Sequence, residues 1–207
     1  MCIRDRTYRE HKRIVFDGNN YSEEWVEEAA RRGLSNLATA VDALPRFSTP
    51  KNIELFERHG VFSKAEVLSR QEILTQDYNN ALNIEALTML DMAKKQILPA
   101  VVKFSGVVAD SYRSKKACNL ELDLSSEESL LRKLSFLQNE LTGAIARLDD
   151  SVIEAKGIAD PLNAARCYND KVFADMQFLR GIADELETIV SEEYWPFPTY
   201  SQLLFYV

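Results

Sequence analysis

Apolar residues recur at every third or fourth position from Ser63 onward, which is the spacing of one face of an α-helix. Ser63 and Glu66 fit a capping box, so a long helix is predicted from Lys64 to Lys116. Pro99 lacks a backbone donor and predicts a kink in this helix, with a break at Asn79–Asn80 as the alternative. The predicted apolar face comprises Ile84, Leu87, Leu90, Ala93, Ile97, Val101, Phe104 and Val108.

Two further amphipathic helices follow a loop that is predicted from Ala117 to Ser125. One runs from Ser125 to Gly157, and the other runs from Asp160–Pro161 to about Glu193. Short connections between long amphipathic helices indicate antiparallel neighbours, so residues 63–193 are predicted to form a three-helix bundle. Its predicted core contains Leu134, Leu141, Leu148, Met176, Leu179 and Leu186.

The segment before the bundle has a different pattern. Ile14 to Phe16 form a short β-type run that Asp17–Asn20 close as a turn, which predicts a strand whose partners lie upstream. Short helices are then predicted from Ser22 to Gly33, around Asn36 to Ala43 before Pro45, and from Thr49–Pro50 to His59–Gly60. The predicted fold is therefore mainly α: a strand remnant and small helices, then a long antiparallel three-helix bundle and an extended aromatic tail.

The two ends of the chain are unusual. Residues 1–6 look like a translated sequencing adapter and are interpreted as an artefact, with a natural but divergent N-terminus as the alternative. In the tail, residues 194–207, Pro196 and Pro198 prevent a helix and many side chains are large and apolar. We expect this tail to dock on an upstream domain or a neighbouring subunit, the alternative being its own bundle.

Composition narrows the possible functions. The chain has 207 residues and a net charge of −7, which argues against nucleic-acid binding. No apolar run reaches the length of about 20 residues that a membrane span requires, and there is no apolar leader segment. The three cysteines, Cys2, Cys118 and Cys167, are far apart, which favours free thiols in a reducing, cytoplasmic compartment.

Candidate chemistry is sparse. His11 and His59 have no second ligand at metal-binding spacing, and Asp17–Asn20 lack the further acids of a calcium loop. Phosphate-binding loops, dinucleotide fingerprints and nucleophile elbows are all missing from the sequence. We therefore assign no catalytic, cofactor-binding or metal-binding residue, and from these residues alone the chain is a helical interaction module.

Several stretches resemble the C-terminal third of type III glutamine synthetases, and the most distinctive are Asp184–Glu187 (DELE) and Glu193–Tyr200 (EYWPFPTY). The other resembling stretches are Arg13–Trp25 (RIVFDGNNYSEEW), Glu28–Leu34 (EAARRGL), Asp42–Pro45 (DALP), Lys51–Ile53 with His59–Phe62 (HGVF), Asn83–Met89 (NIEALTM) and Ile97–Ala100 (ILPA).

The resemblance implies an enzyme that ligates ammonia to glutamate with ATP and Mg or Mn, in rings of subunits. It places the catalytic residues before residue 7, residues 7–62 at the end of the catalytic region, and the bundle and tail in assembly of a homo-oligomer. Two hypotheses follow: a ligase fragment that is inactive alone, or a non-catalytic helical scaffold. The predicted strand favours the first, because an independent module does not need half of a sheet.

Overall fold

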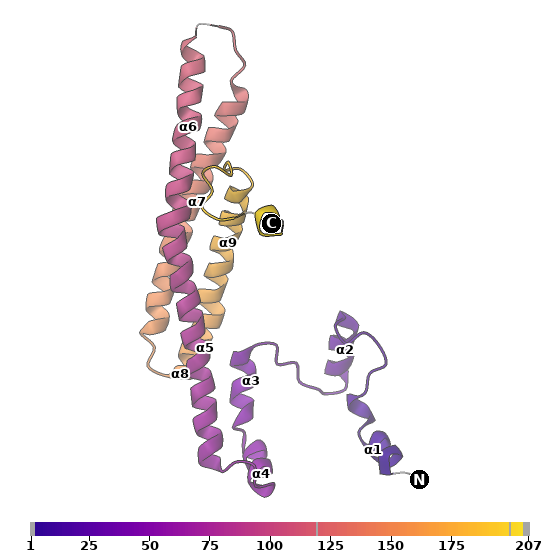
Figure 1. The fold of residues 1–207 in the computed structure, drawn as a ribbon. Coiled ribbons are helices and arrows are strands. Elements are labelled where there is room, and N and C mark those ends of the chain that lie inside the picture. The colour runs from indigo at the N-terminus through magenta and orange to yellow at the C-terminus, as the bar shows by residue number, and fades with distance from the viewer. Residues whose placement is uncertain (1–2, 119, 199, 205–207) are drawn as a thin grey trace. The chain divides into compact units, whose positions relative to one another are not determined.

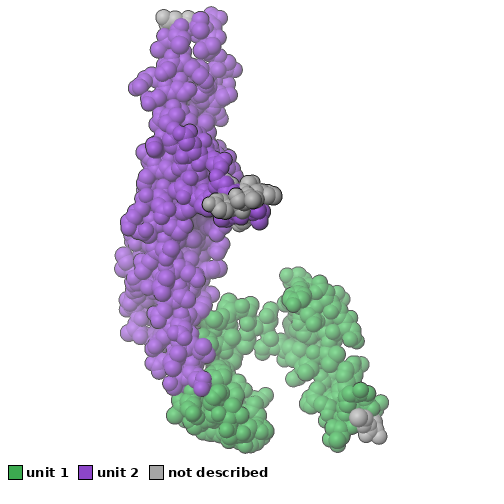
Figure 2. Space-filling model, in the orientation of Figure 1, with its two compact units in different colours: residues 1–67 green, residues 68–207 purple. Residues whose placement is uncertain are grey.

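A computed structural model describes residues 3–118, 120–198 and 200–204 of the chain. It is mainly helical, as predicted, and it divides into two compact units, Met1–Val67 and Leu68–Val207, which Figure 2 shows in different colours. The two units are described separately.

The first unit contains short helices: α1 (Ile3–Glu10), the 3₁₀ helix η1 (Lys12–Ile14), α2 (Glu23–Arg31), α3 (Ala40–Phe47) and α4 (Pro50–Arg58). Two of the predicted helix ends are confirmed, because Gly33 and Gly60 follow α2 and α4 with positive φ angles of 70° and 63°. Only glycine takes that conformation at little cost, so these positions end the helices.

The predicted strand at Ile14–Phe16 is wrong, and no strand occurs in the described part of the chain. Ile14 ends η1, and the Arg32 guanidinium donates hydrogen bonds to the carbonyl oxygens of Val15 at 2.7 Å and Arg13 at 3.2 Å. Phe16 packs on Trp25 with ring centres 4.7 Å apart. A side chain therefore satisfies the carbonyls that a partner strand would otherwise need to satisfy.

The helix predicted before Pro45 begins and ends later than expected. Thr39 caps α3 by accepting a hydrogen bond from the backbone N–H of Asp42 at 3.2 Å, and the helix continues through Pro45 to Phe47. Because α3 begins only at Ala40, the proline removes one intrahelical bond near its start, and the helix tolerates this loss.

The first bundle helix begins as predicted. Ser63 and Glu66 form the capping box, with the Ser63 N–H donating to the Glu66 carboxylate at 2.7 Å. The helix comprises α5 (Lys64–Met92), a π-helical turn η2 (Ala93–Ile97) and α6 (Leu98–Ala117), with no break at Asn79–Asn80 (Figure 1). The irregular turn lies just before Pro99, which cannot donate to the preceding turn.

The second unit is an antiparallel bundle whose remaining helices are α7 (Ser125–Lys156), α8 (Pro161–Cys167), the π-helical turn η3 (Tyr168–Val172) and α9 (Phe173–Glu187). Ion pairs show that α7 runs antiparallel to both neighbouring helices. Lys94 pairs with Asp149 and Lys115 with Glu127 between the first helix and α7. Arg147 pairs with Asp175 and Lys133 with Glu185 between α7 and α9. Asp160 caps α8 as predicted, accepting from the Asn163 N–H at 2.8 Å.

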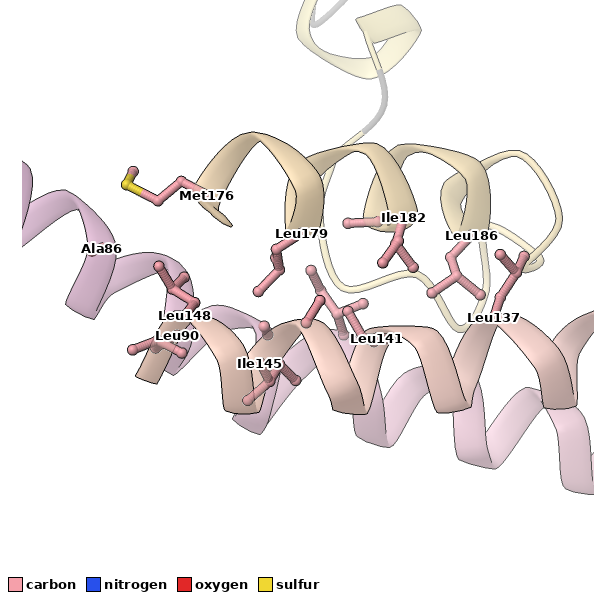
Figure 3. Close-up of a cluster of buried hydrophobic side chains, with 14 of the residues drawn as sticks. Ala86, Leu90, Leu137, Leu141, Ile145, Leu148, Met176, Leu179, Ile182 and Leu186 are labelled. Carbon is pink, nitrogen blue, oxygen red and sulfur yellow. The ribbon is translucent and has the colours of Figure 1, made fainter. Parts of the chain in front are cut away.

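All six predicted core residues on α7 and α9 are buried. Leu141 and Leu148 of α7 and Leu179 and Leu186 of α9 are at most 1% exposed, and Figure 3 shows these side chains in the layer between the two helices. The predicted face of α5 is partly wrong, because Ile84 is 63% exposed and Leu87 is 41% exposed. Leu82 and Ala86 face the core instead, together with Leu90, which was predicted to do so.

The tail differs from the prediction in two ways. The third helix ends at Glu187, not near Glu193, and a short helix α10 (Tyr200–Leu204) interrupts the expected extended segment. Trp195 is 9% exposed within the bundle core, Phe197 packs against that core, and the Tyr194 ring lies 5.7 Å from Phe104. This part of the tail therefore docks on its own bundle, which was the alternative interpretation. Residues 205–207 lie outside the described residues.

Candidate functional site

The side chains with the most reactive chemistry lie apart in the chain. His11 precedes η1 and His59 follows α4, and both are exposed. Cys118 is exposed at the end of α6 and Cys167 is buried at the end of α8, while Cys2 lies outside the described residues. Across residues 3–118, 120–198 and 200–204, no three His, Cys, Asp or Glu side chains come together as metal ligands.

The segment Asp17–Asn20 is a turn, as its composition predicted. The Asn19 side chain accepts from the Tyr21 N–H at 3.0 Å, and the Ser22 hydroxyl donates to the Asn19 carbonyl at 2.7 Å. These bonds are local, and they position the start of α2.

A polar hollow of about 510 Å³ lies between α7 and the third helix of the bundle. Arg147 places Nε 2.5 Å from the Asp175 carboxylate, and the Lys171 ammonium pairs with Glu154. That hydrogen bond to Glu154 raises the pKa of Lys171. The charges are arranged in cross-helix pairs, and this arrangement suits stabilisation of the bundle better than acid–base chemistry. The lining residues are Arg147, Asp150, Ser151, Glu154, Asp170, Lys171 and Asp175.

Polar side chains also join α5 to the start of the third helix. The Tyr78 hydroxyl donates to the Asn169 side chain at 3.2 Å, and the Asn79 amide donates to the Pro161 carbonyl at 2.9 Å. Burial, and then the nearby Asp170, raise the pKa of Tyr78, so its hydroxyl stays protonated as a donor. These contacts fix the axial position of α5 against α8 and η3.

The second hollow, of about 500 Å³, is mostly apolar and lies between α5–η2, α9 and the docked part of the tail. We call it the methionine groove because Met89, Met92 and Met176 line it together with Trp195 and Phe197. Neither hollow was predicted from the sequence. The methionines and Trp195 are far apart in sequence, and only the packing of the helices brings them together. The other lining residues are Ile84, Glu85, Thr88, Ile97, Leu179, Arg180, Ala183, Asp184 and Glu187.

In the described ranges, no helix has both the length and the apolar character that a membrane span requires.

Residues 2–116 match the family model described as the glutamine synthetase C-terminal domain. A glutamine synthetase of Butyrivibrio fibrisolvens is 38% identical over 94% of this chain, and a type-3 glutamine synthetase of Dictyostelium discoideum is 33% identical over 96%. A glutamine synthetase of Bacteroides fragilis is 28% identical over 93% of the chain. The chain spans 28%, 28% and 27% of the lengths of these relatives.

Proposed function

The chain belongs to the family of glutamine synthetase C-terminal domains, and from this premise we propose that it serves structure and assembly in a longer glutamine synthetase. The whole enzyme would ligate ammonia to glutamate with ATP and Mg or Mn, as a cytoplasmic homo-oligomer that binds neither nucleic acid nor a membrane. Residues 7–62 would end its catalytic region, residues 63–193 would form its C-terminal bundle and residues 194–207 its tail.

The donor groups in the described part of the chain do not fit the metal and nucleotide of that reaction. In the described ranges, carboxylates such as Glu154 and Asp175 are paired with Lys171 and Arg147 and are not grouped as ligands. Because the relatives are more than three times as long as the matched segment, we propose that their remaining part supplies the catalytic residues.

The assembly role rests chiefly on the tail. Trp195 and Phe197 anchor it to the bundle, yet Leu203 and Leu204 on α10 remain 62% and 74% exposed. Two adjacent exposed leucines on a short helix are costly in water and are suited to packing against another surface. We propose that α10 packs on the catalytic region or on an adjoining subunit of the whole enzyme.

Deletion of residues 199–207 from the full-length enzyme tests the assembly role. The deletion keeps the Trp195–Phe197 anchor, so the bundle should stay folded while the oligomer weakens. Light scattering after size-exclusion chromatography measures the assembly, and a thermal melt checks the fold. A matched control replaces exposed Phe136 on α7 with serine. An oligomer of unchanged size and stability after the deletion would contradict the proposal.

The proposal that the catalytic residues lie outside this chain is tested separately. We expect the purified 207-residue chain to form no glutamine from glutamate, ammonia, ATP and Mg²⁺. The full-length enzyme assayed in parallel is the positive control. Measurable glutamine formation by the short chain would show that it carries catalytic residues.

A further inference from the structure

The methionine groove has the shape and lining of a binding site for an apolar side chain. Its volume is about 500 Å³, and three methionines contribute to its walls. Methionine side chains are flexible and polarizable, so a groove lined by them can adapt to different apolar shapes. Ile84 lies at this groove and is 63% exposed, so an apolar surface is available to a partner.

The backbone beside the groove is irregular. Met92 immediately precedes the π-helical turn η2, and Ile97 ends that turn, so both lining residues flank the same widened stretch of helix. Trp195 and Phe197 form another wall from a segment without regular structure. Single π-helical turns are frequent at functional sites because they displace side chains from the regular helical positions.

The charges around the groove are predominantly negative. Glu85, Asp184 and Glu187 line it, against one cation, Arg180. The Arg180 Nε donates to Asp184 at 3.1 Å, and the carboxylates of Glu85 and Glu187 form no ion pair within the described ranges. An occupant with a positive charge beside its apolar anchor therefore complements this surface.

Trp195 adds an unsatisfied donor. Its side chain is 9% exposed and lines the groove, and its Nε1 has no hydrogen-bond acceptor among the described residues. A buried donor without an acceptor is unfavourable. The Nε1 atom itself is shielded from solvent, so Trp195 offers the groove the apolar part of its ring.

We propose that the methionine groove binds a cationic amphipathic peptide segment of a partner protein. An apolar anchor fills the space between the methionines, and lysine or arginine beside it pairs with Glu85 and Glu187. This binding is independent of the proposed ligase activity, and it is measurable on the 207-residue chain.

The probe is a synthetic helical peptide with leucines along one face and lysines elsewhere. Trp25 and Trp195 are the two tryptophans, so the variant Trp25→Phe reports binding through Trp195 alone. We expect saturable binding and a shift of indole emission. A peptide with the same composition but scrambled leucines, and one with glutamates replacing the lysines, should bind much more weakly.

Matched variants locate the site. Glu85→Lys with Glu187→Lys should weaken binding roughly fivefold or more, whereas Glu72→Lys with Glu140→Lys, which changes the net charge equally outside the groove, should not. Ile84→Ser should weaken binding, whereas Ile153→Ser, at a residue that is 66% exposed on α7, should not. Equal effects of groove and control variants, or no saturable binding, would overturn the proposal. Circular dichroism confirms that each variant is folded.

Discussion

The Arg147 guanidinium of α7 lies 2.5 Å from the Asp175 carboxylate of α9, and the two side chains differ sharply in exposure. Asp175 is 6% exposed and Arg147 is 58% exposed. Arg147 also lies 5.3 Å from the centre of the Phe178 ring, which helps to hold it in place. A buried charge on the third helix is thus neutralised by a cation that reaches over it from the second.

Removal of Arg147 should destabilise the bundle because it leaves the Asp175 charge buried without a partner. We expect Arg147→Ala to lower the free energy of unfolding by about 1.5–3 kcal/mol in urea denaturation. Lys133→Ala is the matched control, since Lys133 and Glu185 join the same helices at an exposed site, where about 1 kcal/mol or less is expected. The double variant Arg147→Met with Asp175→Leu should recover most of the loss. Equal losses for the two single variants would contradict this view of the pair.

Leu141 lies in the centre of the core and is fully buried. We expect Leu141→Ala to cost roughly 2–5 kcal/mol, because it removes apolar contacts and leaves a cavity. Phe136→Ala on the same helix, at a side chain that is 62% exposed, should change the free energy of unfolding far less. A denaturation midpoint that is unmoved by Leu141→Ala would show that α7 packs by another face.

The two described cysteines should differ in reactivity. Burial, and then the charge of Glu154, raise the pKa of the Cys167 thiol, whereas Cys118 is exposed. In a Cys2→Ser background, a disulfide reagent should label Cys118 quickly and Cys167 only on unfolding, since the thiolate is the reacting form. Cys118→Ser and Cys167→Ser separate the two rates. Rapid labelling of Cys167 in the folded chain would contradict its burial.

The same pKa shift predicts a pH dependence of stability. Because folding raises the pKa of Cys167, its contribution to stability is complete below about pH 8.5 and is lost as the pH rises through the folded value. Cys167→Ala lacks this contribution. The difference in unfolding free energy between the native chain and this variant should therefore shrink at alkaline pH, in urea titrations between roughly pH 7 and pH 11.

Trp195 should anchor the tail by packing and not by hydrogen bonding. Its Nε1 has no acceptor in the described ranges, so Trp195→Phe loses no hydrogen bond and should cost less than about 1.5 kcal/mol. Trp195→Ala should cost roughly 3–5 kcal/mol, because it empties the end of the core. Equal costs for both variants, measured by chemical denaturation, would indicate a hydrogen bond that the structure does not contain.

The sequence by itself determined where several helices begin and end and which faces of α7 and α9 are buried. The helix ends are set by hydrogen bonds or backbone angles within a few residues, so they can be predicted from the local sequence. Examples are the caps at Ser63 and Asp160 and the positive φ angles at Gly33 and Gly60. The leucines of α7 recur at a regular helical spacing on one face, so only that face is apolar enough to be buried in the core.

Only the tertiary structure decided which face of α5 is buried, which conformation Ile14–Phe16 adopt and where Trp195 packs. Leu82 and Ile84 are both apolar, and packing into the bundle core selects the face that carries Leu82. Arg32 donates a hydrogen bond to the Val15 carbonyl, 17 residues away, which a partner strand would otherwise have to satisfy. Trp195 packs in the core although it lies beyond the end of the third helix, where helical periodicity cannot predict its position. Such contacts join residues that are distant in sequence, so their energies depend on the packed arrangement and not on local preference.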